Sequence, residues 1–571
     1  MLYVLVSWQT PSERLYDVTI RFTAPVDTPR LLLPAWRPGR YLIQNYAANV
    51  REWSAGDARA WKDGKTSWRI EARAGEEVVF RYRYYAGVLD AGSSFLDDEE
   101  AYFNGTNLFM MVEGLRQEAH LLTVAAPADW TIETQLPRED EQTFRARDYD
   151  HLIDSPVIAA AALTRHSFTA AGARFHLVFH GDDGIDTGQF LEPLRAIAQT
   201  QASLFGGTFP FREYRFLVHL RDRWHGVEHE DSCSIVARRS ALLGTRPGPA
   251  ERIGGDGFDK FLSICSHELF HAWNVKRIVP ARFAPYDYWQ ETPTRLLWAM
   301  EGMTSYFGDL SLVRSGLWSV RRYLSHLAAE IEVLEQMPAR NHLSLSQASF
   351  DGWLSDPAQM HDAPNAWFSF YNKGEIVSAL LDLTIRRATE GARSLDDVLT
   401  ILWDEYGKTG RGVEEDAMER AVARITDVGD FFARYVDGTD SLPYQELFGA
   451  AGVAFATAAR DVDRPFLGAR LATREGALVV ESVIRGAAGM EAGLLPNDEV
   501  LALGGDRVPT EAALQNALRG VGMGETAELL VSRAGILRTL SLTARVDPRP
   551  LVSLAIEGDS ELRRVWLGRE E

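Results

Sequence analysis

Residues 266–271 place two histidines and a glutamate at a spacing that suits a metal ion. Apolar residues recur at helical spacing across residues 258–275, which predicts a helix with one buried face. His267 and His271 are four residues apart, so on that helix both imidazoles leave the same side. Two neutral imidazoles on one face can bind a divalent cation, most often zinc. Glu268 points to the adjacent side, where it would reach a water held by the metal and act as a general base.

Glu301 is the candidate for a third metal ligand, which is needed because the short histidine pattern also arises by chance. Residues 292–294 read as an N-cap followed by proline, and they predict a helix that ends near Gly316. Glu301 lies mid-helix among mostly apolar residues, where an ionised carboxylate is costly unless a partner compensates its charge. That partner is either zinc or an ion-paired Arg295 or Arg314. Two histidines and one glutamate, with a fourth position open to water, are typical of catalytic zinc.

A short acidic stretch precedes the expected metal helix. It contains Gly226, Val227, Glu228, His229, Glu230 and Asp231. It follows a predicted strand, so it suits a sheet edge to which an extended peptide could add itself as a further strand. Glu228, with Glu230 or Asp231, could hold the free α-amino group of a substrate. The alternative is a solvated acidic loop.

Tyr371 stands at the entrance of a further helix, which is predicted to run from about residue 373 to Arg387. A tyrosine in such a position can aim its hydroxyl into a cleft and stabilise an oxyanion. It can equally be a core or rim residue. Lys276 and Arg277 lie near the end of the metal helix, where cations suit the helix dipole.

Composition limits the classes of protein to consider. A chain of 571 residues is expected to hold more than one domain, and 46% apolar residues suit sizeable buried cores. The net charge of −20 argues against a nucleic-acid partner and against an anionic membrane surface. Two cysteines are too few for a disulfide framework. No secretory signal and no apolar run long enough to span a bilayer are seen, so a cytoplasmic protein is expected.

Periodicity changes along the chain. Period-two alternation at residues 16–22 and 80–84 predicts strands with one wet face, in a region that is all-β to about residue 170. Two strands, at 174–180 and 214–220, flank a helix at 187–205, and the chain is then mostly helical to about residue 440. Residues 460–546 form a separate unit of short strands and two helical segments.

This last unit resembles a PDZ domain, most specifically at residues 492–501. Asn497 stands where the PDZ pattern usually has glycine, and asparagine tolerates the left-handed backbone that the turn requires. The loop before Leu467 and Gly468 would be the carboxylate-binding loop of such a domain. One alternative is that this loop binds a peptide or a C-terminus. The other is that the domain only packs on the catalytic part or gates it.

A larger resemblance covers nearly the whole chain. Residues 267–278, 298–306 and 226–229 resemble the glycyl aminopeptidase family, the gluzincin zinc metallopeptidases of metallopeptidase family sixty-one with a C-terminal PDZ domain. That family is similar in design to aminopeptidase N, which implies an acidic anchor for the substrate's amino terminus. Glu228 matches this anchor, with Val227 and His229 in place of methionine and asparagine. Tyr371 resembles the tyrosine that stabilises the transition state.

The resemblance implies a multidomain α+β fold. Its expected parts are an N-terminal β-rich domain (1–170), a thermolysin-like, mainly helical catalytic domain (171–458), a PDZ domain (459–548) and a C-terminal tail (549–571). Together these observations predict one catalytic zinc ion on His267, His271 and Glu301, with Glu268 and Tyr371 as catalytic residues. Gly226, Val227, Glu228 and His229 would bind a peptide with a free N-terminus, which the family implies begins with Gly or Ala.

Two other functions remain open. One is a zinc metalloendopeptidase whose PDZ domain recruits protein substrates, the acidic stretch being only a rim. The other is a peptide-binding protein that has lost catalysis, although all three ligands and the base are present.

Overall fold

The computed structural model describes residues 1–244, 257–355, 360, 362–460 and 463–568. The chain divides into two compact units. The first unit comprises residues 1–294, 307–319 and 396–421, and the second comprises residues 295–306, 320–395 and 422–571.

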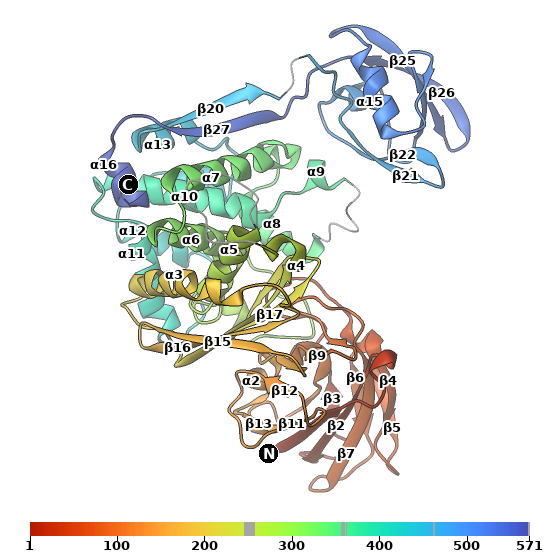
Figure 1. The fold of residues 1–571 in the computed structure, drawn as a ribbon, viewed down its shortest axis with the longest axis vertical. Coiled ribbons are helices and arrows are strands. Elements are labelled where there is room, and N and C mark those ends of the chain that lie inside the picture. The colour runs from red at the N-terminus through yellow and green to blue at the C-terminus, as the bar shows by residue number, and fades with distance from the viewer. Residues whose placement is uncertain (245–256, 356–359, 361, 461–462, 569–571) are drawn as a thin grey trace. The chain divides into compact units, whose positions relative to one another are not determined.

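Three sheets build the N-terminal part of the first unit (Figure 1). The six-stranded sheet contains, in spatial order, β13 (Thr143–Ala146), β11 (His120–Ala125), β1 (Leu2–Ser7), β2 (Leu15–Thr23), β7 (Glu77–Tyr85) and β4 (Val50–Ser54). One four-stranded sheet contains β10 (Met111–Val112), β3 (Arg30–Leu32), β6 (Ser67–Ile70) and β5 (Ala60–Gly64). The other contains β12 (Thr131–Glu133), β14 (Val157–Ala160), β9 (Glu100–Phe103) and β8 (Phe95–Leu96). In β2 and β7 every second residue is buried, which confirms the predicted period-two strands.

A five-stranded sheet follows, and it carries the acidic stretch on its edge. Its spatial order is β15 (Thr164–Ala170), β16 (Ala173–His180), β17 (Glu213–Arg221), β19 (Ser232–Arg238) and β18 (His225–Glu228). The sheet begins before the predicted boundary at residue 170, because β15 pairs along its whole length with β16. Among the described strands β18 pairs only with β19, so it is an edge strand of the described sheet, as the sequence predicted.

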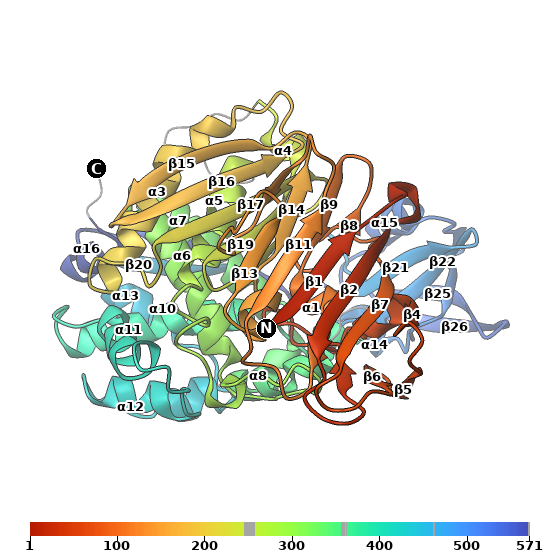
Figure 2. The same ribbon diagram turned by 90° about the horizontal axis from the view of Figure 1, so that it is seen from below.

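Helices α3 (Leu191–Leu204) and α5 (Gly257–Phe270) pack against each other and against this sheet (Figure 2). Strands β9 and β14 of the N-terminal part contribute Tyr102 and Ile158 to a fully buried cluster with Val178 and Leu217 of the sheet. The sheet is therefore packed from both sides, by helices and by the N-terminal domain.

The metal helix ends earlier than predicted. Helix α5 stops at Phe270, whereas the apolar period predicted a helix to residue 275. The amide of His271 still donates to the carbonyl of His267, at 3.3 Å, so His271 keeps the helical phase. The helix cannot continue regularly, because the imidazole of His271 takes the carbonyl oxygen of Asn274 as its partner.

The helix that carries Glu301 starts later than predicted. It begins with the π-helical turn Trp298–Gly302 and continues as α6 (Met303–Arg314). Thr292, the predicted N-cap, lies outside the helix. The amide of Trp298 donates instead to the hydroxyl of Ser349, at 3.0 Å.

The second unit combines helices with a two-stranded ribbon and a small β-domain. Its longer helices are α7 (Val320–Glu335) and α10 (Phe370–Ala388), and shorter ones are α8 (Leu345–Phe350), α9 (Ala363–Ala366) and α13 (Tyr444–Ala450). The predicted C-terminal tail forms β27 (Pro550–Ile556), which pairs with β20 (Val453–Ala459), and α16 (Glu561–Leu567). Trp566 of α16 is fully buried and its indole N–H donates to the hydroxyl of Tyr306, at 2.8 Å, so this segment is part of the core. Residues 569–571 lie outside the described residues.

Residues 463–545 form the β-domain expected from the PDZ resemblance. Its sheet contains, in order, β21 (Ala469–Arg474), β22 (Ala477–Val483), β23 (Glu499–Leu503), β25 (Thr526–Arg533) and β26 (Ile536–Thr543). Helix α15 (Glu511–Arg519) is capped by Thr510, whose hydroxyl accepts from the amide of Ala513, as predicted. Asn497 has a φ of 69°, the left-handed conformation expected for it.

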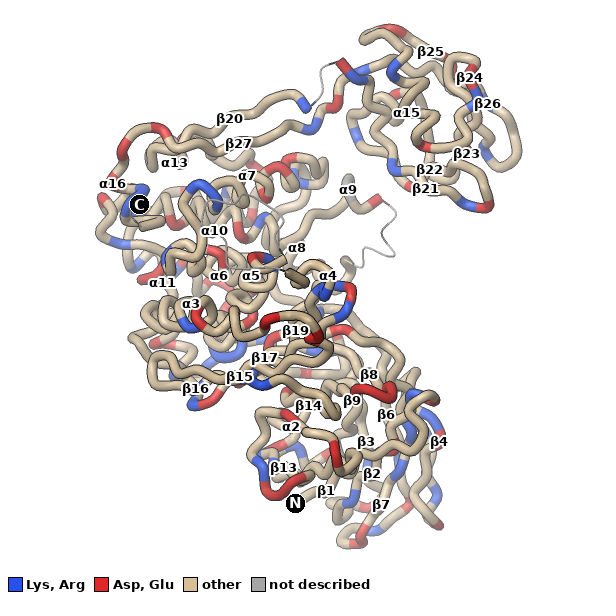
Figure 3. The backbone as a smooth tube through the Cα atoms, in the orientation of Figure 1, with Lys and Arg blue, Asp and Glu red and all other residues tan. Residues whose placement is uncertain are grey.

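Acidic and basic residues are interspersed along the backbone of each unit (Figure 3). Among the residues that the structure describes, no helix combines the length and the apolar character needed to cross a membrane.

Candidate metal and peptide-binding site

The two histidines of the metal helix face a common point. Their Nε2 atoms lie 3.0 Å apart. Nδ1 of His271 lies 2.6 Å from the carbonyl oxygen of Asn274, and since a carbonyl only accepts, Nδ1 carries the proton. Nε2 of His271 is therefore a lone-pair donor, the state that binds a metal. Two nitrogens bound to one tetrahedral zinc would be about 3.3 Å apart, so the pair fits the ion.

Glu268 lies beside a glycine of the edge strand. Its side chain is 6% exposed. A Cβ placed on Gly226 would overlap the Glu268 carboxylate, 2.7 Å from its Cδ, so any larger residue at position 226 would displace the base. The hydroxyl of Tyr214 on β17 donates to the backbone carbonyl of Glu268, at 3.2 Å, and ties the helix to the sheet.

Glu228 completes an acidic group around His271. The ligand atoms of Glu228, Glu268 and His271 all lie within 4.8 Å of one another. Glu228 is only 4% exposed, and its Oε1 has no hydrogen-bond partner within the described part of the chain. Two buried carboxylates this close repel each other unless a cation stands between them. The arrangement can therefore hold a metal ion, a substrate ammonium group, or both.

Strand alternation separates the four predicted substrate-binding residues into two pairs. Gly226 and Glu228 face the metal helix, as the contacts of Glu268 and the acidic group show. Val227 faces away and is buried against Ala91. His229 is also turned elsewhere, with Nδ1 3.2 Å from Oδ1 of Asp154. The side chains of Val227 and His229 thus support the strand rather than line the acidic group.

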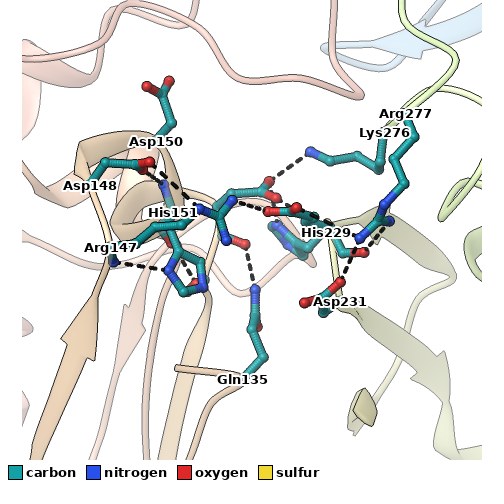
Figure 4. A network of polar contacts seen from close by, with 12 residues as sticks. Gln135, Arg147, Asp148, Asp150, His151, His229, Asp231, Lys276 and Arg277 are labelled. Atoms are coloured by element: carbon teal, nitrogen blue, oxygen red, sulfur yellow. Dashed lines mark hydrogen bonds and ion pairs between the residues drawn. The ribbon is translucent and has the colours of Figure 1, made fainter. Parts of the chain in front are cut away.

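A polar network fastens the acidic stretch to the N-terminal domain (Figure 4). Oδ1 of Asp154 accepts from Nζ of Lys276 at 2.8 Å, and its Oδ2 accepts from the amide of Glu230 at 2.8 Å. The guanidinium of Arg277 donates to Oδ1 of Asp231 at 2.9 Å. Lys276 and Arg277 are therefore paired cations, which goes beyond the helix-dipole role that the sequence suggested.

These charges change the ionisation of the pair at the centre of the network. Burial alone would raise the pKa of Asp154, but the Lys276 charge and the His229 imidazole hold it well below its usual range. Burial alone would lower the pKa of Lys276, but Asp154, with Tyr286 and Glu228 further off, raises it above its usual range. Both groups are charged at neutral pH, and Glu228 lies within the field of Lys276.

In the second unit, the helices of Glu301 and Tyr371 cross at two glycines. A Cβ placed on Gly302 would lie 2.5 Å from Cα of Gly374, and one on Gly374 would lie 2.9 Å from the carbonyl oxygen of Trp298. Glu301 precedes the first glycine and is 1% exposed. Tyr371 is the second residue of α10, half-buried, with its ring stacked on Phe370 at 4.9 Å between centroids.

In the first unit, the continuation of the Glu301 helix lies against the metal helix. A Cβ placed on Gly308 would lie 3.3 Å from Cα of His267. The hydroxyl of Ser266 donates to the carbonyl of Gly308, at 2.7 Å. Since Gly308 follows Glu301 by seven residues, which is two helical turns, the two residues share one face of the helix.

Sequence reasoning missed two contributors to the site. One is Asp154, which neutralises Lys276, and the other is Gly39, whose backbone lies against the Glu228 carboxylate. Both come from the N-terminal domain, and Asp154 lies 122 positions before the lysine that it neutralises. The only local signal was the Pro38-Gly39 turn, which predicts a bend but not what the bend touches.

Family models of known proteins match three segments of the chain. The family model described as the Peptidase M61 N-terminal domain matches residues 4–161, the M61 glycyl aminopeptidase model matches residues 260–377, and the PDZ domain model matches residues 465–543. The second of these segments contains the three predicted metal ligands, the base and Tyr371. No curated protein sequence matches the chain.

Among solved structures, an aminopeptidase N family protein from Idiomarina loihiensis superimposes with a TM-score of 0.90 and 29% identity, covering 99% of this chain and 100% of that one. An M1 zinc metallopeptidase from Deinococcus radiodurans, solved with a Tyr-Ser-Ala substrate, gives a TM-score of 0.46 and 16% identity over 77% of this chain and 94% of that one. The chain thus matches the models of the M61 N-terminal domain and of the M61 glycyl aminopeptidase, followed by a PDZ domain, and is a peptidase.

Proposed function

We propose that the protein is a zinc-dependent aminopeptidase that removes N-terminal residues from peptides, with a preference for Gly or Ala. The observation that carries this proposal is the buried group of Glu228, Glu268 and His271, whose ligand atoms lie within 4.8 Å of one another. A metal ion on the histidine side and a substrate ammonium on the Glu228 side would satisfy both carboxylates. The description of the matching family as glycyl aminopeptidases supports the preference for small residues.

The metal ligands in this proposal are His267, His271 and Glu301. The Nε2 atoms of His267 and His271 lie 3.0 Å apart, which suits two ligands of one ion. Continuity of the helix supports the third ligand, because Glu301 shares a helix face with Gly308, which lies against His267. Burial of Glu301 also calls for a cation, as the sequence already indicated. When bound, a zinc ion would acidify a water molecule and polarise the scissile carbonyl.

Three side chains of the protein would perform the other steps of the reaction. Glu228 holds the substrate's ammonium group, which sets the register so that one residue is removed at a time. Glu268 takes a proton from the attacking water and passes it to the leaving amine. Tyr371 donates a hydrogen bond from its hydroxyl to the oxyanion of the tetrahedral intermediate and stabilises it.

A metalloendopeptidase is the second candidate, favoured by the open edge of β18 and by the PDZ domain. An extended peptide could pair with that edge in either case. The two candidates differ in their need for a free amine. An N-acetylated peptide is a substrate for an endopeptidase but not for an enzyme anchored at Glu228.

Zinc content and amine dependence test the proposal. Glu301→Gln and His267→Ala should lose bound zinc in an elemental analysis of the purified protein, whereas Glu419→Gln, an exposed residue of another helix, should retain it. Glu228→Ala should raise KM for free-amine peptides by about 10- to 100-fold, the cost of losing one charged contact. Full zinc content in Glu301→Gln, or an equal KM effect on acetylated and free peptides, would reject the assigned roles.

A further inference from the structure

We infer that Gly39 is a positioning residue for the amine anchor: because it has no side chain, the Glu228 carboxylate can take the orientation that receives a substrate ammonium group. This inference rests on the proposed role of Glu228. It assigns to the N-terminal β-domain a direct part in amine recognition, and it predicts that only glycine is compatible with that part.

Position 39 has no room for a side chain. A Cβ placed on Gly39 would lie 2.8 Å from Oε1 and 2.9 Å from Cδ of Glu228, and closer still to Oε2. Ordinary contacts of this kind are about 3.5–4.0 Å, so no side chain fits without moving the carboxylate. Because Cδ is the farthest of these three atoms, the added Cβ would lie in front of the two carboxylate oxygens, where a substrate ammonium group would bind.

The loop that carries Gly39 is itself held firmly. Gly39 has a φ of +77°, the left-handed region that favours glycine, and the amide of Arg40 donates to the carbonyl of Arg37 across the turn. The buried guanidinium of Arg37 donates to the carbonyl of Pro38, at 3.0 Å. A displaced Glu228 therefore cannot simply push this turn away.

Both flanks of the loop are fastened to the segment that follows the metal helix. The indole N–H of Trp36 donates to the carbonyl of Asp287, at 2.7 Å, and this tryptophan is fully buried. The ring of Tyr41 stacks on Phe283, with 5.9 Å between centroids. The position of Gly39 is thus set by residues of the peptidase region, which keeps it in register with Glu228.

The Glu228 carboxylate has hydrogen-bonding capacity to offer a substrate. Its Oε1 has no hydrogen-bond partner within the described part of the chain, and the nearby Lys276 is held by Asp154. An ammonium contact with a carboxylate depends on direction, so the space in front of the oxygens must stay open. Glycine at position 39 leaves that space open, whereas any side chain there would fill it.

Substitution of Gly39 tests this role against a matched control. Gly39→Ala should raise KM for glycyl and alanyl amides by about tenfold or more, while kcat changes by less than about threefold, because it disturbs binding of the amine rather than the chemical step. Gly56→Ala is the control, since Gly56 also has a positive φ of 67° in the N-terminal domain but would meet nothing within 4 Å. It should leave both constants unchanged.

A compensating change separates the contact from general damage. Glu228→Asp retracts the carboxylate by one methylene and makes room for the new methyl group, so Gly39→Ala with Glu228→Asp should have a KM no higher than the worse single variant. If Gly39→Ala alone does not fold, the same double variant should restore a folded protein. Three results would overturn the inference. They are additive effects of the two substitutions on log KM, an unchanged KM in Gly39→Ala, and a double variant that stays unfolded where Gly39→Ala does not fold.

These results remain distinct from failure of the proposed function. If the proposed function fails, the unmodified protein would release no amine from glycyl or alanyl amides, or its release of amine would continue with a chelator present. If it is active and chelator-sensitive, the variants test Gly39 alone.

Discussion

Nζ of Lys276 lies 2.8 Å from Oδ1 of Asp154, a residue 122 positions earlier in the chain. Lys276 follows the metal helix, and Asp154 belongs to the N-terminal domain. Glu228 lies within the electrostatic reach of the same lysine. If Glu228 is the proposed amine anchor, the aspartate holds a positive charge that would otherwise compete with the substrate ammonium for Glu228.

Asp154→Asn should weaken amine binding and stability together. It leaves Lys276 buried without its anion, and breaking such a pair costs about 3–5 kcal/mol. The freed ammonium is also available to pair with Glu228, so KM for free-amine peptides should rise by about tenfold at least. Steady-state kinetics and thermal unfolding measure the two effects. Asp129→Asn, at an exposed position of the same domain, should change neither; an unaltered KM in Asp154→Asn would contradict the account.

Glu268→Gln should abolish turnover while leaving the metal in place. Glutamine keeps the size of the side chain beside Gly226 but cannot accept the water's proton. General-base catalysis contributes about 10²- to 10⁴-fold, so kcat should fall by that factor. Zinc content should equal that of the unmodified protein. Undiminished turnover at full zinc occupancy would remove Glu268 from the mechanism.

Gly374→Ala should separate the helices of Glu301 and Tyr371. The added methyl group would meet the Trp298 carbonyl at 2.9 Å and Cα of Gly302 at 3.0 Å, and backbone atoms cannot yield as side-chain ends do. Overpacking of this kind costs about 1–3 kcal/mol, and kcat should fall because Tyr371 shifts. Gly449→Ala is the matched control, because a Cβ on this helical glycine would meet nothing within 4 Å. It should be neutral or stabilise the helix by about 0.5–1 kcal/mol.

Glu100→Gln should change how stability depends on pH. This fully buried carboxylate contacts the imidazoles of His219 and His180, with Oε2 3.2 Å from Nδ1 of His180. Burial alone would raise the pKa of Glu100, but the charge of His219 and the hydrogen bond from His180 hold it well below its usual range. A carboxyl with a lowered pKa in the folded state stabilises the protein above its unfolded pKa, near 4.3, and this contribution is lost as the pH falls toward the folded value.

Urea unfolding at pH 7, 5 and 3.5 checks this sign. The free energy of unfolding of the unmodified protein should fall between pH 5 and pH 3.5. At pH 7 the free energy of unfolding of Glu100→Gln should be lower by about 3–5 kcal/mol. Below pH 4.3 it should depend less on pH than that of the unmodified protein. Glu99→Gln, its exposed neighbour, should follow the unmodified protein. Parallel profiles for the unmodified protein and Glu100→Gln would refute the assignment.

The sequence predicted the parts of this fold that depend on local pattern. Helix α5, the β16 and β17 strands, the edge position of β18 and the capped helix after Thr510 all follow from periodicity or short turn signals. The helix boundaries that were predicted wrongly depend on contacts with residues far away in the sequence. Thr292 before Pro293 looks like a helix cap, but the helix starts at Trp298, whose amide donates to Ser349.

The features that the sequence did not predict depend on contacts between residues far apart in the chain. Residues 549–571 read as a tail because nothing local shows that Trp566 is buried beside Tyr306. In the site, the histidine spacing identified the metal helix, but a single sequence cannot reveal that Asp154 and Gly39 approach it from the N-terminal domain. Such contacts depend on how two sheets pack, which period and propensity do not encode.

One turnover assay tests the central claim most directly. It compares glycyl, alanyl and leucyl reporter amides with an N-acetylated peptide, each with and without a zinc chelator. The account predicts release from the glycyl and alanyl amides that the chelator abolishes and added zinc restores, little release from the leucyl amide, and no cleavage of the acetylated peptide. Cleavage of the acetylated peptide, or release that survives the chelator, would contradict it.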